Sequence, residues 1–210
     1  MTIATEALEQ LRLGNRRFVS GVRGRGAPTG PARREELVAG QNPFAIILGC
    51  SDSRVPAEIV FDQGLGDLFV IRVAGNIVAS SQIESVEFAA HLFGTRLVVV
   101  LGHSMCGAVQ ATLEELERPT ENRSLNHRSI IDRIRPSVEA LLLETNLRHD
   151  PDALIRLAVR ANIDASVQQL RHGSQILEQL IQTDGLLVVG AEYSLETGVV
   201  EFFDDPPDAG

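Results

Sequence analysis

The sequence has few residues of several types, and each scarcity excludes a class of protein. Only two of its 210 residues are cysteine, which excludes a disulfide-rich framework. Its longest apolar runs have the length of a strand and fall far short of the roughly 20 residues that a membrane span requires. The N-terminus lacks the charged-then-apolar pattern of a signal peptide, so we expect a cytoplasmic protein.

Linkers and phosphate-binding loops are also missing. No Pro/Gly/Ser-rich stretch divides the chain, so we expect one domain over residues 1–210 with a sizeable core. There is no internal repeat, no GxGxxG motif and no Walker motif. Lysine is absent and every basic residue is arginine, from which we draw no function. The net charge of −9 argues against nucleic acid as a partner.

Charge divides the chain into a basic arm and an acidic body. Residues 1–40 carry seven Arg and four Glu, so the arm has a net charge of +3 and the rest of the chain −12. Helical spacing of apolar residues over 4–19 predicts a helix, and a turn-rich segment separates it from a short helix near 32–39. We interpret this arm as a device for docking on a second subunit; a solvated terminus is the alternative. Residues 205–210 are expected to be disordered.

The remaining pattern predicts an α/β fold. Strands are expected at 44–49, 67–73, 97–102, 186–191 and 198–204, and helices at 81–93, at 107–117 and within 125–181. Pro136, Pro151 and Gly173 are expected to divide the last region into several helices. Alternating strands and helices predict a mostly parallel sheet of four strands with helices on both faces. A tight turn at Thr197-Gly198 makes the fifth strand an antiparallel edge.

Both cysteines follow predicted strands. Cys50 comes directly after the run 44–49, and His103 and Cys106 follow the run 97–102. Parallel strands deliver such residues to one carboxyl edge of the sheet, and thiolate and imidazole are zinc ligands. A buried Cys or a His after a strand is by itself more often a packing or turn residue. The two motifs together favour zinc, and the 56 residues between the thiols exclude a CxxC redox pair.

The motifs CSDSR from Cys50 and HSMCG from His103 resemble those of the β-class carbonic anhydrases, in their bacterial, plant-like subgroup. The resemblance covers roughly residues 35–204, including 62–76 and 186–198. It implies one Zn²⁺ per chain and reversible hydration of carbon dioxide to bicarbonate and a proton by zinc-bound hydroxide. It also implies a homodimer or homotetramer whose N-terminal helices wrap a partner.

Asp52 and Arg54 are the expected catalytic pair. A bidentate bond from Arg54 leaves Asp52 free to accept a hydrogen bond from the zinc-bound water. If that bond breaks, Asp52 can itself ligate zinc and close the site, and the resemblance implies that the family has both states. The alternative is an ion pair that only stabilises a turn.

The resemblance also implies which residues line the substrate pocket. They are Gln41, Phe69, Val73 or Ala74, and Phe88, with the Gly107 backbone N–H near the product oxygens. The alternative for the two phenylalanines is ordinary core packing. Phe88 stands where the plant-like subgroup has Tyr, so a phenolic hydrogen bond is missing. Ile47 replaces the Trp of the bicarbonate-regulated bacterial subgroup, which puts a bicarbonate effector site in doubt.

Two other functions remain open from the sequence. The same scaffold supports hydrolysis of carbonyl sulfide or carbon disulfide, and pocket shape would separate these substrates. A non-catalytic oligomer in which zinc only stabilises the fold is the third possibility, although structural zinc sites typically use four Cys or His ligands. Four further histidines, at 91, 127, 149 and 172, are interpreted as surface or capping residues, and none is assigned as a proton shuttle.

Overall fold

The computed structural model describes residues 3–22, 29–118, 125–143 and 150–203, with side chains throughout except at 125–128. The tail that we expected to be disordered lies outside the described residues. His149 and the side chain of His127 also lie outside them. None of the helices in the described ranges combines the length and hydrophobicity that a membrane crossing requires.

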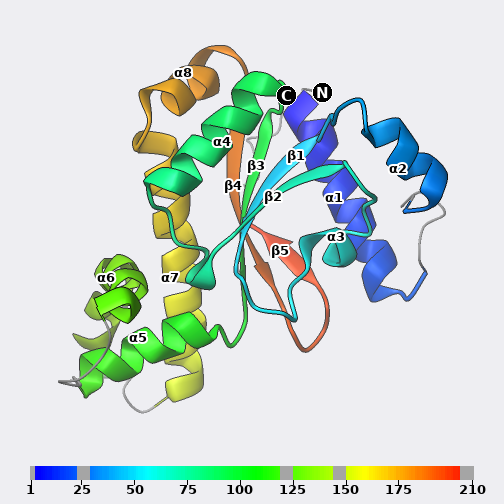
Figure 1. Cartoon of the computed structure of the whole chain (residues 1–210). Helices are drawn as coiled ribbons and strands as arrows, with labels where there is room; N and C mark the ends of the chain where they lie inside the picture. Colours follow the sequence, from blue (N-terminus) through cyan, green and yellow to red (C-terminus); the bar gives the residue numbers. More distant parts are fainter. Residues whose placement is uncertain (1–2, 23–28, 119–124, 144–149, 204–210) are drawn as a thin grey trace, which may run out of the picture.

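One five-stranded sheet forms the centre of the molecule, in the order β2-β1-β3-β4-β5 (Figure 1). The strands are β1 (Ala45–Gly49), β2 (Leu68–Arg72), β3 (Leu97–His103), β4 (Leu187–Tyr193) and β5 (Val200–Phe202). The first four are parallel to their neighbours, and β5 pairs antiparallel with β4. The predicted fold class is therefore confirmed, with strand ends shifted by one or two residues.

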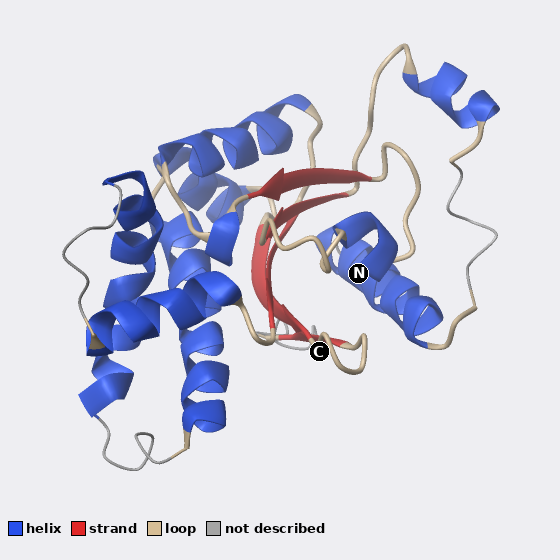
Figure 2. Cartoon of the chain, turned by 60° about the horizontal axis from the view of Figure 1, so that its bottom comes forward, coloured by secondary structure: helices blue, strands red, loops and turns tan. Residues whose placement is uncertain are grey.

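Helices cover both faces of the sheet (Figure 2). They are α1 (Ile3–Val19), α2 (Pro31–Leu37), α3 (Ala57–Val60), α4 (Ser80–Leu92), α5 (Gly107–Glu117), α6 (Leu125–Val138), α7 (Pro151–His172) and α8 (Gln175–Thr183), with 3₁₀ turns η1 (Ala74–Asn76) and η2 (Glu139–Leu143). Side chains alternate along a strand. In β1, Ile46 and Leu48 pack in the core beneath α4–α8, whereas Ala45 and Ile47 pack beneath α1 and α3. Burial on both faces explains why β1 and β3 read as uninterrupted apolar runs.

The helical region after residue 125 differs in one detail from the prediction. Pro136 lies inside α6, two residues before the helix ends, and does not divide it. Pro151 begins α7 and Gly173 caps its end, as the sequence indicated. At the start of α7 the Asp150 side chain accepts a hydrogen bond from the Ala153 N–H, which satisfies one unpaired donor of the first turn.

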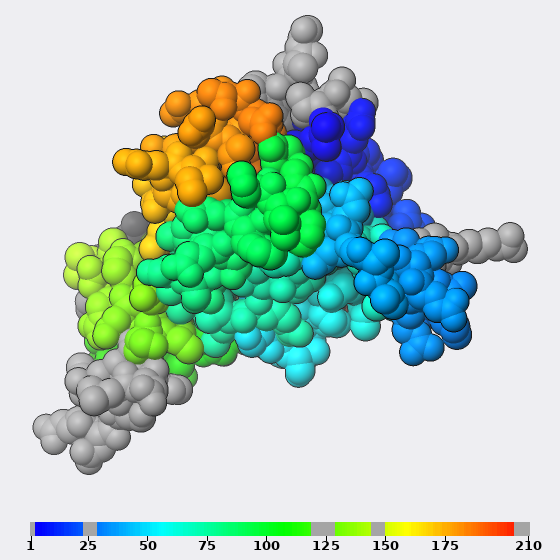
Figure 3. Space-filling model, turned by 45° about the horizontal axis from the view of Figure 1, so that its top comes forward, coloured from blue at the N-terminus to red at the C-terminus, as the bar shows by residue number. Residues whose placement is uncertain are grey.

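The helix of the N-terminal arm packs one face on its own chain, and its docking on a partner stays a prediction. Buried Asn15 of α1 donates to the carbonyls of Val60 and Gly198 and accepts from the Val200 N–H. These bonds tie α1 to the end of α3, to the loop before β5 and to the start of β5. By contrast, α2 has no buried residue and stands at the side of the body (Figure 3). The outer face of α1 also exposes the apolar side chains of Ile3 and Leu13.

Candidate metal centre

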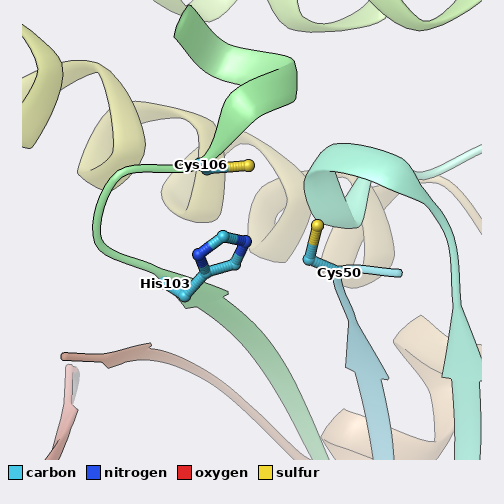
Figure 4. A group of neighbouring side chains, drawn as sticks. All are labelled: Cys50, His103 and Cys106. Atoms are coloured by element: carbon cyan, nitrogen blue, oxygen red, sulfur yellow. The ribbon is translucent and has the colours of Figure 1, made fainter. Parts of the chain in front are cut away.

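Two neighbouring strands deliver three soft donor groups to one point. Cys50 directly follows β1, His103 is the last residue of β3, and Cys106 precedes the first residue of α5. Because β1 and β3 are parallel and in register, both motifs leave the sheet at the same edge. Their ligand atoms all lie within 4.8 Å of one another, and all three residues are buried. Figure 4 shows both sulfurs and the imidazole gathered around one space.

The state of His103 fits a metal ligand. Its Nδ1 lies 2.9 Å from the Ser104 carbonyl oxygen, so this nitrogen carries the proton and Nε2 keeps its lone pair. Nε2 is one of two buried side-chain polar atoms without a hydrogen-bond partner in the described part of the chain. A buried, unpartnered acceptor is costly unless another group binds it. A metal ion held with the two sulfurs would satisfy Nε2, and two thiolates with one imidazole suit Zn²⁺.

Electrostatics favour a cation at the same point. A hydrogen bond from Cys106 lowers the pKa of the Cys50 thiol, whereas that hydrogen bond and burial raise the pKa of Cys106. The second thiol therefore resists ionisation next to the first, since two thiolates at this distance repel each other. Burial alone would lower the pKa of His103, but its interactions with Cys50, the Ser104 carbonyl and Asp52 together raise it. A divalent cation would relieve this concentration of negative charge and allow both thiols to ionise.

Asp52 and Arg54 form a bidentate pair at the rim of this centre. Arg54 donates from Nε to Oδ1 over 2.9 Å and from Nη2 to Oδ2 over 2.7 Å, and its backbone N–H also donates to Oδ1. These bonds to Arg54 hold the pKa of Asp52 well below its usual range. Oδ2 also lies 3.8 Å from Nε2 of His103. The carboxylate is thus ionised, oriented by arginine and adjacent to the three donors.

Arg72 supports the loop that carries Cys50 and Asp52, a role that was not predicted from the sequence. Its Nε donates to the Cys50 carbonyl over 3.1 Å, and its Nη2 donates to the Asp52 carbonyl over 2.6 Å. Arg72 ends β2 and pairs in register with Gly49, the residue before Cys50. A charged residue at the end of the predicted strand at 67–73 was the signal available in the sequence.

A second support lies behind Cys50 and was also not predicted from the sequence. The Gly75 N–H of η1 donates to the Cys50 sulfur over 3.4 Å. The Asn162 side chain of α7 in turn donates to the Gly75 carbonyl over 2.8 Å. Nothing in the sequence indicated this link, because η1 is too short to show a period and 87 residues separate the two partners.

The predicted pocket residues fall into two groups, the first of which lies beside the centre. Val73 exchanges backbone hydrogen bonds with Gly49 and Ser51, next to Cys50. Ala74 follows Val73 as the first residue of η1. Gly107 begins α5 directly after Cys106. A lining role for these three residues is compatible with their positions and stays a prediction.

The second group lies elsewhere in the chain. Gln41 is exposed and precedes β1, at the edge of the sheet opposite the centre. Phe69 pairs in register with Ile46, four residues before Cys50, and its ring centroid lies 6.3 Å from that of Phe88. Phe88 is 53% exposed on α4. Within a single chain these residues do not meet the three donors.

Two histidines outside the motifs have described side chains, and neither belongs to the three-donor cluster. His91 lies in the last turn of α4 and is exposed. His172 ends α7 and is also exposed. Basic residues in the last turn of a helix interact favourably with its dipole.

Comparison with known proteins agrees with this geometry. The family model described as "Carbonic anhydrase" matches residues 45–200. Carbonic anhydrase 2 of Mycobacterium tuberculosis is 38% identical over 196 residues, covering 91% of this chain and 89% of that protein. The carbonic anhydrase of Mycolicibacterium smegmatis is 38% identical over 199 residues, covering 93% and 91%.

A solved structure gives the class within that family. The β-carbonic anhydrase CafA of the fungal pathogen Aspergillus fumigatus superimposes with a TM-score of 0.73 at 25% identity, over 85% of each chain. The resemblance found in the two sequence motifs is therefore confirmed. The chain belongs to the β-class carbonic anhydrases.

Proposed function

We propose that this protein catalyses the reversible hydration of carbon dioxide to bicarbonate and a proton. One Zn²⁺ per chain would be held by Cys50, His103 and Cys106. The observation that carries the proposal is the convergence of these three buried donors beside the carboxylate of Asp52. When bound there, zinc would supply an acidified water as the nucleophile for carbon dioxide.

The chain's own residues prepare that reaction. Ser104 holds the proton of His103 on Nδ1, which leaves Nε2 for the metal. Arg54 donates to both carboxylate oxygens of Asp52 and so fixes the orientation of the carboxylate. Because each oxygen has two lone pairs, Oδ2 can accept a further hydrogen bond from the attacking water. Such a hydrogen bond would orient the water, and Asp52 would act as the hydrogen-bond acceptor while the oxygen attacks carbon dioxide. The charge-assisted pair with Arg54 keeps Asp52 as an acceptor, because an ionised carboxylate has no proton to donate.

The proposed substrate pocket requires a second copy of the chain. Gln41, Phe69 and Phe88 line the substrate pocket only if another subunit brings them to a neighbour's metal centre, since they lie away from their own. We propose a homodimer or homotetramer in which they do so. Light scattering at micromolar concentration tests the assembly, and a stable monomer with full activity would contradict it.

The redox state of the two cysteines bears on location. Both must be reduced to bind zinc as thiolates, and both are free in the described structure. We therefore expect the protein to work in a reducing compartment such as the cytoplasm.

A stopped-flow assay of carbon dioxide hydration, combined with metal analysis, tests the function. Wild-type protein is expected to contain one zinc per chain and to hydrate carbon dioxide. Cys50→Ala and His103→Ala are each expected to lose zinc and activity together. His91→Ala is the matched control, because His91 is exposed on α4 and is expected to keep both.

The alternatives are outcomes of the same measurements. Bound zinc without hydration activity would favour a non-catalytic metal site. Hydrolysis of carbonyl sulfide or carbon disulfide in place of hydration would favour the sulfur-analogue hydrolase. Full zinc occupancy in a variant lacking both cysteines would overturn the ligand assignment itself.

A further inference from the structure

The backbone turn behind Cys50 has an unusual conformation. Gly75 and Asn76, the last two residues of η1, both have positive φ, at 69° and 43°. Glycine tolerates this region, but a residue with a side chain adopts it at a cost. The Asn76 side chain offsets little of that cost, because its buried Nδ2 has no hydrogen-bond partner. A strained turn of this kind persists only when its surroundings hold it in place.

Two side chains of α7 supply that hold. Asn162 Nδ2 donates to the Gly75 carbonyl over 2.8 Å, and Ser166 Oγ donates to the Asn76 carbonyl over 3.0 Å. Both side chains are buried. They are four residues apart, so they lie one above the other on the same face of the helix. Two successive carbonyls of η1 are therefore fixed by one helix face.

The turn held in this way presents a donor to the metal centre. The Gly75 N–H donates to Cys50 Sγ over 3.4 Å and is directed at the sulfur by the conformation of η1. Hydrogen bonds to a ligating thiolate change its electron donation to the metal and the stability of the complex. Gly75 itself has little room to move, because a Cβ at this position would lie 2.8 Å from Ile134 and 3.1 Å from Ala108.

We propose that Asn162 and Ser166 are positioning residues of the metal centre. Through η1 they hold the Gly75 N–H against the Cys50 sulfur and so set the donor strength of that ligand. This inference rests on the proposed metal site, but the roles of the two residues go beyond it. Without the two bonds η1 relaxes, the N–H leaves the sulfur, and the thiolate becomes more electron-rich while its geometry becomes looser.

The first measurement is spectroscopic and uses cobalt(II) in place of zinc in the full-length protein. Thiolate-to-cobalt charge-transfer bands report the electron density of the ligating sulfur. Asn162→Leu, which keeps the branched shape and the number of heavy atoms but removes the donor, is expected to move the band to longer wavelength. Ser166→Ala is expected to shift it in the same direction by less. Ser166→Thr, which keeps the hydroxyl, is expected to restore the wild-type position.

The second measurement is zinc affinity, by competition with a chelator. Loss of an outer-shell partner typically weakens metal binding by about 10- to 100-fold, and we expect Asn162→Leu to fall in this range. Val167→Ala is the matched control, since Val167 is buried on α7 next to Ser166 but packs against Gly190. It is expected to lower thermal stability and leave the cobalt band and the zinc affinity unchanged.

The outcomes separate this inference from the proposed function. Wild-type protein that takes up neither zinc nor cobalt would overturn the metal site and the inference with it. Wild-type protein that binds both, together with folded Ser166→Ala and Asn162→Leu variants that keep the wild-type band and affinity, would overturn the inference alone. An equal band shift in Val167→Ala would also overturn it, because the shift would then follow from loss of stability. If Asn162→Leu does not fold, the comparison of Ser166→Ala with Ser166→Thr decides between these outcomes.

Discussion

Arg54 holds both carboxylate oxygens of Asp52, over 2.9 Å and 2.7 Å, two residues along the chain and at the rim of the three-donor cluster. Bidentate pairs of this kind fix the plane of the carboxylate as well as its charge. Arg54 is more than half exposed, with 56% of its side chain accessible, whereas Asp52 is mostly covered. An exposed ion pair contributes little to the stability of the fold, so we expect this pair to contribute mainly to catalysis.

Asp52→Asn is the direct test of that role. The variant is expected to keep zinc and to lose about 10²-fold in hydration rate, since an amide cannot both pair with Arg54 and accept from the attacking water as a carboxylate does. Because Arg54 lowers the pKa of Asp52, the carboxylate stays ionised in the assay, and the deficit is expected to be constant from about pH 7 to 9, where Asp52 remains paired with Arg54. Stopped-flow kinetics of the zinc-loaded proteins measures both properties.

Asp150→Asn is the matched control for this substitution. Asp150 caps α7 far along the chain from the motifs, and Asn is as good an N-cap as Asp, so activity is expected to be unchanged. Near wild-type turnover in Asp52→Asn would show that the pair only stabilises the turn.

A second prediction concerns Asp52 at lower pH. Its Oδ2 lies 2.7 Å from Nη2 of Arg54 and 3.8 Å from Nε2 of His103, so the carboxylate lies between Arg54 and the residues that would hold the metal. Bound zinc would hold water less tightly than hydroxide, so it would become more open to a carboxylate ligand as pH falls, and Asp52 keeps its charge because Arg54 lowers its pKa. We expect Asp52 to leave Arg54 for the metal reversibly as pH drops below neutrality.

Zinc-edge X-ray absorption or crystals at two pH values check this exchange, because kinetics alone cannot distinguish it from simple protonation at an open site. Zinc should change its fourth ligand from solvent to carboxylate oxygen. Asp52 still paired with Arg54 at about pH 6, with solvent on zinc, would contradict the exchange and leave the proposed enzyme intact.

The parts of the molecule that were predictable from sequence are those specified by local pattern. Strand β3 reads as an apolar run because both its faces are buried. His103 and Cys106 could be placed beside Cys50 because parallel strands share a carboxyl edge. Helix α5, at Gly107–Glu117, has the predicted bounds, and it begins at the glycine that ends the HSMCG motif.

What could not be predicted depends on contacts between distant segments. The link from Asn162 to Gly75 joins residues 87 positions apart and leaves no period in the sequence. The packing of α1 on its own sheet depends on Asn15, a polar residue that satisfies three backbone groups no local pattern identifies. Pro136 was expected to end a helix, yet a proline near the end of α6 disturbs only its last turn.

The contact between α1 and α3 gives a third prediction. Gly14 lies in α1 where a Cβ would stand 1.8 Å from the Phe61 carbonyl oxygen and 2.8 Å from Gln63 Nε2. Gly14→Ala therefore forces α1 away from the body and is expected to destabilise the fold by about 1–3 kcal/mol or more. Chemical denaturation monitored by circular dichroism measures the change.

Gly30→Ala provides the comparison. A Cβ there meets nothing within 4 Å, and Gly30 has a negative φ of −72°, so the cost is expected to be about 1 kcal/mol or less. Equal stability of the Gly14→Ala and wild-type proteins would show that α1 does not pack against its own chain in solution.

The last prediction concerns stability and pH at the β4–β5 edge. Glu192 is half-buried and directly opposite Glu201 in the antiparallel pair, while Arg160 lies 3.9 Å from Glu201. Burial first, and then the charge of Glu201, raise the pKa of Glu192 despite Arg160. Two like charges facing each other across strands destabilise a sheet.

A carboxyl whose pKa is raised by folding binds protons more tightly in the folded state. Its stabilising contribution is therefore complete below the unfolded pKa of about 4.3 and is lost as pH rises through the folded value. Glu192→Gln removes the charge and is expected to raise the melting temperature by on the order of 2 °C at pH 7. This gain should shrink toward zero at about pH 4, where the wild-type carboxyl is itself protonated. Thermal scans of both proteins across that range measure this change. A gain that persists at acid pH would show that it does not come from the charge of Glu192, and a loss at neutral pH would show that Glu192 is stabilised as an anion by Arg160.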